Sequence, residues 1–275
     1  MRKPIPWKKY LYNSRVYSSL VFIPLFIAML AMAPKWLFFI LLISALGMAL
    51  NELWLMLCPA ESKCLKWLAF ALSFGLAAAA YEGGIAIFAG FFVLITIVLV
   101  LAILPLGFDE KGLYVLGRLL IIIIYLPLLL SHLLLLWDLP DGRSLVAMIF
   151  LVTWGGDAFS YYSGTAWGRH KLAPNISPNK TIEGSVGGVI GAGLFSLLLV
   201  GTGQVSSPWF FILILGMIAN IAGQLGDLFE SYLKRFAGLK DSGVIIPGHG
   251  GVLDRLDSVL FAVPVIYYGM LVLGS

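Results

Sequence analysis

One stretch of the chain, residues 231–257, carries many of the side chains that could do chemistry. Its sequence is SYLKRFAGLKDSGVIIPGHGGVLDRLD, with four basic side chains, three aspartates, one histidine and five glycines. The chain around it is apolar, because only 12% of all residues are charged and 60% are hydrophobic. Charged side chains are costly in apolar surroundings unless they are paired or bind a ligand. We therefore expect a functional site in or beside this stretch.

Carboxylates recur at helical spacing directly before this stretch and at its end. Gln224, Asp227 and Glu230 lie three residues apart, and Ser231 directly follows Glu230. They share one face of a helix, and Asp254 and Asp257 share another if a helix begins near Gly251. Several carboxylates at one membrane interface suggest a metal site. Mg²⁺ takes oxygen ligands and is typically held by one or two carboxylates together with substrate phosphates.

The basic and glycine residues of the stretch suit a phosphate ligand. Four basic side chains could neutralise phosphate oxygens in phosphoryl or nucleotidyl transfer: Lys234, Arg235, Lys240 and Arg255. Glycines at 248, 250 and 251 suit a tight turn whose N–H groups approach a phosphate. A salt-bridged loop without a ligand is the alternative. His249 by itself indicates a structural histidine, and only its neighbours make it a candidate for binding.

A second polar region lies earlier in the chain. Asp157 falls within an apolar segment, where an ionised carboxylate costs at least ~2.5 kcal/mol, so we expect a functional role. A carboxylate that is hydrogen-bonded only for packing is the alternative. The loop at 166–183 is basic and contains two prolines, which exclude a continuous helix. Its end, SPNKTIEG, contains Ser177, Lys180 and Glu183 at the start of the next apolar run, where free helix N–H groups favour anions.

The hydropathy of the chain predicts an all-α polytopic integral membrane protein. The mean hydropathy is +0.98, and apolar runs near twenty residues recur along the sequence. Nine spans are expected: 18–33, 35–57, 65–81, 85–104, 117–137, 143–165, 181–201, 207–230 and 256–273. We divide the chain into residues 1–140, a helical scaffold that could contact lipid and a second subunit, and residues 141–275, a catalytic region.

The distribution of basic residues predicts the orientation. Alternate loops on one side of the nine-span map carry 16 of the 18 Lys and Arg residues. Basic loops favour the cytoplasm, so the N-terminus and the loops at 166–183 and 231–257 should face it, with the C-terminus on the opposite side. This bias also explains the pI of about 9.0 without a nucleic-acid partner.

The polar stretch resembles the signature of the phosphatidate cytidylyltransferases, also called CDP-diacylglycerol synthases. The pattern S-x-x-K-R-x-x-x-x-K-D-S-G-x-x-x-P-G-H-G-G-x-x-D-R-x-D runs from Ser231 to Asp257. Upstream, D-x-F-S-Y-Y-x-G-x-x-x-G-R-H-K-L at 157–172, ISPNKTIEG and GDLFES are similar to that family's pattern. Residues 150–260 carry the resemblance, whereas the first 140 match in hydropathy and at Glu52.

The resemblance implies a multi-pass enzyme of the bacterial cytoplasmic membrane that joins CTP to phosphatidic acid, giving CDP-diacylglycerol and pyrophosphate. It also implies a Mg²⁺ requirement, K⁺ as a second cation and a homodimer. The metal would be held by Asp227, Asp254 and Asp257. The expected catalytic residues are Asp227, Lys234, Arg235, Lys240, Asp241, Asp254, Arg255 and Asp257. The expected substrate-binding residues are Asp157, Ser177, Lys180, Glu183, Ser231, His249, Gly250 and Gly251.

Two other functions are compatible with parts of the sequence. A CTP-dependent polyprenol or dolichol kinase would also use Mg²⁺ and a membrane substrate, but it would transfer the γ-phosphate. A cation-coupled transporter could use Asp157 and the clustered carboxylates. The long signature and the one-sided basic loops argue against the transporter.

Overall fold

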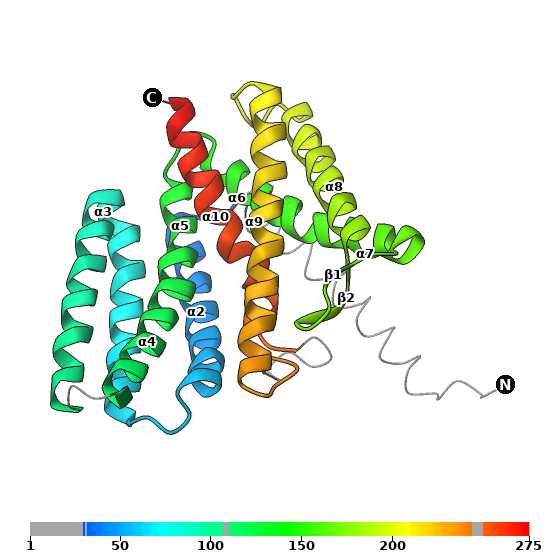
Figure 1. The fold of residues 1–275 in the computed structure, drawn as a ribbon. Coiled ribbons are helices and arrows are strands. Elements are labelled where there is room, and N and C mark those ends of the chain that lie inside the picture. Colours follow the sequence, from blue (N-terminus) through cyan, green and yellow to red (C-terminus); the bar gives the residue numbers. More distant parts are fainter. Residues whose placement is uncertain (1–29, 31, 107–109, 244–249, 275) are drawn as a thin grey trace, which may run out of the picture.

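The structure of the chain is a computed structural model that describes residues 30, 32–106, 110–243 and 250–274 (Figure 1). Helices dominate it, and one short β-hairpin lies between α7 and α8. The elements in chain order are α2 (Lys35–Leu57), α3 (Lys63–Ile103), a 3₁₀ turn (Leu104–Leu106), α4 (Glu110–Ile123), a π-helical turn (Ile124–Leu128), α5 (Leu129–Trp137), α6 (Gly142–Phe150), a second π-helical turn (Leu151–Gly155), α7 (Gly156–Trp167), β1 (Lys171–Ala173), β2 (Ser177–Thr181), α8 (Ile182–Gly201), α9 (Trp209–Phe236) and α10 (Leu253–Gly274).

Seven helical stretches among the described residues are long and apolar enough to cross a membrane. They are Lys35–Leu57, Lys63–Ile103, Glu110–Trp137, Gly142–Trp167, Ile182–Gly201, Trp209–Phe236 and Leu253–Val272. The chain is therefore an all-α, multi-pass membrane protein, as its hydropathy predicts. The expected first span, 18–33, lies almost wholly outside the described residues, and the count of nine stays a prediction.

The helix α3 contains two of the expected spans. A straight helix of its 41 residues would be ~60 Å long, about twice the thickness of the bilayer hydrocarbon. The backbone turns sharply at Gly84, with φ 60° and ψ −167°. A Cβ atom on Gly75 would lie 2.5 Å from the ring of Phe91, so the two halves fold back on each other, as Figure 1 shows. They correspond to the expected spans 65–81 and 85–104.

Two membrane-length stretches are interrupted by π-helical turns. The turn between α4 and α5 contains Pro127, which has no N–H group to donate to the helix. In the turn between α6 and α7, the carbonyl of Val152 accepts a 2.7 Å hydrogen bond from the Asn220 amide of α9. A side chain from a neighbouring helix thus satisfies the irregular backbone directly before Asp157.

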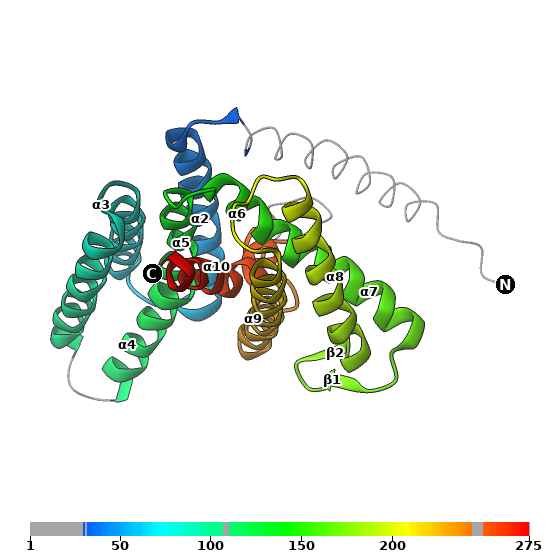
Figure 2. The ribbon, with the colours of Figure 1, turned by 90° about the horizontal axis from the view of Figure 1, so that it is seen from above.

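Small residues allow α7 and α8 to approach each other closely. A Cβ atom on Gly184 would lie 2.8 Å from the carbonyl oxygen of Ser160, and one on Gly188 would lie 3.1 Å from that of Gly156. Such close backbone contact is common where glycines face each other in membranes. In Figure 2, α9 and α10 lie between this pair and the α2–α5 helices.

The basic connections lie at one end of the helices. Figure 1 shows the α2–α3 connection, the β-hairpin and the α9–α10 connection at that end. Lys35 lies at the opposite end, where its ammonium group contacts the Tyr81 carbonyl at 2.6 Å and the Asp138 carboxylate at 2.8 Å. The position of these connections agrees with the expectation that the basic loops lie on one side of the membrane. That this side is the cytoplasm stays a prediction.

We expect Gly84→Ala to lower the free energy of unfolding by about 1–3 kcal/mol, because its backbone angles are accessible essentially only to glycine. No described atom lies within 4 Å of an added Cβ atom, so the backbone alone accounts for the cost. The control is Gly90→Ala, where space is equally open and the backbone is helical. It should be neutral or stabilise by up to about 1 kcal/mol. Equal melting temperatures of the two variants in detergent would contradict the turn.

Candidate functional site

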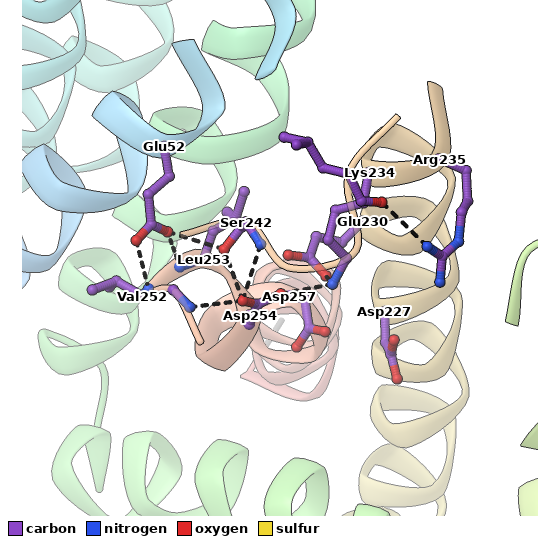
Figure 3. Close-up of polar contacts among 12 residues, drawn as sticks. Glu52, Asp227, Glu230, Lys234, Arg235, Ser242, Val252, Leu253, Asp254 and Asp257 are labelled. Carbon is purple, nitrogen blue, oxygen red and sulfur yellow. Dashed lines mark hydrogen bonds and ion pairs between the residues drawn. The ribbon is translucent and has the colours of Figure 1, made fainter. Parts of the chain in front are cut away.

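The helix α9 presents a row of charged side chains near its end. Asp227, Glu230 and Lys234 follow at intervals of three and four residues, which aligns them along the helix (Figure 3). The helix extends past the expected end at residue 230, and Lys234 and Arg235 in its last turn favour this because cations stabilise a helix C-terminus. Glu230 is 0% exposed, so an ionised carboxylate there requires a counter-charge.

Lys234 provides that charge and joins α9 to α10. Its ammonium group forms an ion pair with Glu230, one turn earlier on α9. It also forms an ion pair of 2.6 Å with Asp254 in the first turn of α10. One lysine therefore pairs with two carboxylates from two helices, and it fixes the start of α10 against the end of α9.

Asp254 accepts hydrogen bonds at both carboxylate oxygens. Its Oδ2 accepts from the N–H of Gly251 at 2.7 Å, and from the N–H and hydroxyl of Ser242 at 3.2 and 2.9 Å. Its Oδ1 accepts from Lys234. Gly250, with φ 83°, leads the chain into this turn in a conformation that favours glycine. In this structure Asp254 thus organises the beginning of α10.

Two glycines of α9 allow α10 to pack against its backbone. A Cβ atom on Gly226 would lie 2.5 Å from the carbonyl oxygen of Asp257, and one on Gly223 would lie 3.0 Å from that of Ser258. Larger residues would separate the helices at the level of the carboxylates. The two glycines therefore keep Asp257 close enough to interact electrostatically with Asp227.

Lys180 brings together the two regions that the sequence singles out. It lies on β2, and its ammonium group forms an ion pair with Asp227 of α9. Asp157 of α7 interacts electrostatically with both of these groups, and also with Asp257 of α10. Residues from four elements thus form one polar group. We call it the carboxylate cluster, and it consists of Asp157, Lys180, Asp227, Glu230, Lys234, Asp254 and Asp257.

The chain around the β-hairpin is held by its own side chains. Thr181 caps α8 through its hydroxyl, which accepts a 3.1 Å hydrogen bond from the first turn of that helix. Glu183 accepts from the N–H groups of Arg169 and His170 at 3.1 and 3.2 Å, and its Oε1 lies 2.6 Å from the His170 ring. Glu183 therefore holds the segment before β1 in this structure, and its expected contact with substrate stays a prediction.

The other expected site residues lie outside the carboxylate cluster. Arg235 donates to the carbonyls of Ile176 and Leu239 at 3.4 and 3.2 Å, which links the end of α9 to the hairpin turn. Six more of them are partly or fully exposed, namely Ser177, Ser231, Lys240, Asp241, Gly250 and Arg255, and Gly251 is buried. His249 lies outside the described residues. The catalytic and binding roles of all these residues stay predictions.

Comparison with known proteins identifies the family. A sequence profile of the cytidylyltransferase family matches residues 13–273, nearly the whole chain. The chain belongs to the cytidylyltransferase family. It is 38% identical over 162 residues to a phosphatidate cytidylyltransferase of Bacillus subtilis (strain 168), an alignment that covers 58% of each chain.

Other relatives bear the same name. The chain is 45% identical over 126 residues to a phosphatidate cytidylyltransferase of Staphylococcus saprophyticus, covering 46% of this chain and 48% of that one. It is 42% identical over 138 residues to one of Brucella abortus, covering 50% and 51%. The chain thus spans about half of the length of these two relatives and somewhat more of the first.

The donor atoms of the carboxylate cluster suit a hard cation. The carboxylate cluster offers oxygen ligands, and both buried oxygens of Glu230 lack a hydrogen-bond partner, although Oε2 forms the ion pair with Lys234. Among the described residues, however, no three Asp, Glu, His or Cys side chains converge as metal ligands. Lysines lie beside Asp227 and Asp254 instead. The metal-binding role of Asp227, Asp254 and Asp257 stays a prediction.

Sequence reasoning missed two polar side chains that support this site, Asn220 and Ser242. Gln224 donates to the amide oxygen of Asn220 at 2.8 Å and to the carbonyl of Ser185 at 3.1 Å, which joins α9 to α8. Asn220 precedes Gln224 by one turn in an apolar helix, and this spacing could have revealed it, because polar side chains in membranes need partners. Ser242 gives no such signal, since a serine in a loop is common.

We expect Lys234→Met to lower the free energy of unfolding by about 3–5 kcal/mol, because it leaves the buried Glu230 carboxylate unpaired. Adding Glu230→Gln should recover much of the loss, since the amide carries no charge. Lys171→Met, at an exposed lysine on β1, is the control and should change stability by less than about 0.5 kcal/mol. Unfolding in detergent measures all three, and a double variant as unstable as Lys234→Met would contradict the pairing.

Proposed function

We propose that the chain is a membrane-embedded phosphatidate cytidylyltransferase, which joins CTP to phosphatidic acid and releases pyrophosphate. The observation that carries the proposal is the ion pair between Lys180 and Asp227, because it supports one site built from both motifs. The names of the relatives support the substrate pair.

In the proposed reaction, a phosphate oxygen of phosphatidic acid attacks the α-phosphorus of CTP. The new P–O bond forms as the bond between the α-phosphorus and the α–β bridging oxygen breaks, and pyrophosphate leaves with the electron pair. Phosphatidic acid is already anionic, so the attack needs little general-base catalysis. Lys180, Lys234 and the basic residues around the carboxylate cluster would stabilise the developing charge.

We propose Mg²⁺ as the cofactor and K⁺ as a second cation. In the carboxylate cluster five carboxylates accompany two lysines, so a cation would offset excess negative charge where the effective dielectric constant is low. Asp227, Asp254 and Asp257 would hold it. When bound, Mg²⁺ neutralises phosphate oxygens and favours departure of pyrophosphate. Lys180 and Lys234 would then be available to the phosphates.

We propose that the site faces the cytoplasm of a bacterial cell, with the C-terminus on the opposite side, and that the enzyme is a homodimer. The basic connections at one end of the helices support this orientation. CTP would enter from the cytoplasm while the acyl chains of phosphatidic acid stay among the helices. The dimer rests on the family resemblance.

Purified protein with phosphatidic acid, Mg²⁺ and CTP labelled at the α-phosphorus should form labelled lipid. Asp227→Asn and Asp257→Asn should each lower kcat at least ~100-fold, because each removes charge beside the reacting phosphates. Asp138→Asn makes the same chemical change at the opposite end of the helices and should keep kcat within about twofold. Full activity of the first two variants would contradict the site.

The position of the label tests the reaction itself. CTP labelled at the γ-phosphate should release labelled pyrophosphate and leave the lipid unlabelled. A polyprenol or dolichol kinase would instead transfer the γ-label to a lipid alcohol and release CDP. A transporter would move its substrate without nucleotide turnover. Either result, with no lipid-linked CMP, would refute the proposal.

Chelation should test the cofactor. We expect EDTA to abolish formation of CDP-diacylglycerol and Mg²⁺ to restore it, since charge on the triphosphate must be neutralised. Mg²⁺ together with CTP should also raise the melting temperature, because a ligand that binds only the folded state stabilises it. Asp257→Asn should lose this shift and Asp138→Asn should keep it. Full activity in EDTA would contradict the metal requirement.

A further inference from the structure

Glu52 is a buried carboxylate from the N-terminal half that reaches the beginning of α10. It lies on α2, near the end of that helix, and is 3% exposed. A carboxylate in such surroundings is stable only with hydrogen-bond donors or counter-charges around it. Its donors come from residues 190 to 201 positions later in the chain, beside the carboxylate cluster.

Three groups donate to Glu52. Oε1 accepts from the N–H of Val252 at 3.0 Å, whereas Oε2 accepts from the N–H of Leu253 at 2.9 Å and from the hydroxyl of Ser242 at 3.1 Å (Figure 3). The N–H groups at the start of a helix have no partners within it, so Glu52 caps α10 from another helix. Both of its oxygens are therefore engaged with the protein.

Two glycines make room for the Glu52 carboxylate. A Cβ atom on Gly251 would lie 2.5 Å from Oε2 of Glu52, and one on Gly243 would lie 2.6 Å from Oε1. Both distances are shorter than a carbon atom tolerates, so any side chain at either position would displace Glu52. These contacts give Gly243 and Gly251 of the signature stretch a steric role in addition to any contact with phosphate.

The hydroxyl of Ser242 connects Glu52 to the carboxylate cluster. It lies 3.1 Å from Oε2 of Glu52 and 2.9 Å from Oδ2 of Asp254. Because a hydroxyl has one proton, the two carboxylates share it. Asp254 in turn binds Lys234, which binds Glu230. A continuous series of contacts thus runs from α2 to α9.

We propose that Glu52 is a positioning residue for the nucleotidyl transfer: it fixes the start of α10, and through Ser242 it sets where Asp254 and Lys234 lie. This inference rests on the proposed function. In this proposal Glu52 acts through Ser242 and the start of α10, since both of its oxygens bind protein donors. Displacements of about 1 Å in a site can lower a rate ~100-fold, so loss of this contact should appear in kcat.

Glu52→Gln tests the proposal with the least change of shape. In either orientation of the amide, its NH₂ group faces a backbone N–H of Val252 or Leu253, so a hydrogen bond becomes a contact between two donors. We expect kcat to fall about tenfold to 100-fold while KM for CTP and for phosphatidic acid changes less than about threefold, because positioning for the transition state is lost.

Hydrogen exchange provides a readout that does not depend on activity. In Glu52→Gln, the backbone amides of Val252 and Leu253 should exchange at least ~10-fold faster, while those in the middle of α9 stay unchanged. Glu82→Gln is the matched control, because Glu82 is an exposed glutamate of the same half at the opposite end of the helices. It should change neither exchange nor kcat.

Ser242→Ala separates positioning from general stability, since it removes the shared hydroxyl and keeps both backbone contacts to Glu52. Its effect on kcat should be less than additive with that of Glu52→Gln, as for residues of one network. Three results would each overturn the proposal. Hydrogen exchange could be unchanged in Glu52→Gln, or it could be faster while kcat of that variant stays within threefold of the unsubstituted protein. The effects of Glu52→Gln and Ser242→Ala on kcat could also be additive. If the unsubstituted protein forms no CDP-diacylglycerol, the proposed function fails, and exchange still tests the contact of Glu52.

Discussion

A charge within apolar helices must have a partner, and the ion pairs of Lys234 meet this requirement for two helices at once. Glu230 has no exposed surface, and desolvation of an unpaired carboxylate there would cost several kcal/mol. Lys234 offsets that cost on α9 and also binds Asp254 of α10. The same ion pairs that offset charge in the site therefore also fix the position of α10 relative to α9.

Irregular backbone near the site is stabilised in the same way, by side chains of other helices. A bilayer core has no water to satisfy a free carbonyl, and the Asn220 amide donates to that of Val152. At the start of α10, Glu52 accepts from two N–H groups that have no partner within the helix. Glycines allow the approach that these contacts need, because a Cβ atom on Gly156 would clash with the Asn220 amide nitrogen and one on Gly251 would lie 2.5 Å from Oε2 of Glu52. Packing and polar pairing therefore depend on each other.

The sequence predicts the spans well because hydropathy is a local property. The expected span 35–57 coincides with α2, and the expected boundaries of α8 differ from the observed ones by one residue. The helix α9 continues six residues past the expected end at 230, a difference that arises because charged residues that continue a helix past the membrane resemble a loop in sequence. The π-helical turn before Asp157 could not be predicted, because it contains no proline and the Asn220 side chain that binds its backbone lies on another helix.

The sequence predicts which residues form much of the site, but it does not predict which of them contact one another. Helical spacing groups Asp227 with Glu230, and the signature stretch supplies Asp254. The assignment of each lysine to its carboxylate depends on contacts between distant segments, which periodicity cannot reveal. Glu52 is the clearest case, since its partners follow by 190 residues or more.

The two lysines of the carboxylate cluster connect ligand binding to the fold. Lys180 joins β2 to α9, and Lys234 joins α9 to α10, so each ion pair crosses between elements. A triphosphate that competes for either lysine must weaken a contact that holds two elements together. Linkage is reciprocal, so the positions of the β-hairpin and α10 must in turn affect the affinity for that phosphate. For this reason a residue such as Glu52, which fixes α10 from outside the carboxylate cluster, can influence the reaction without touching a substrate.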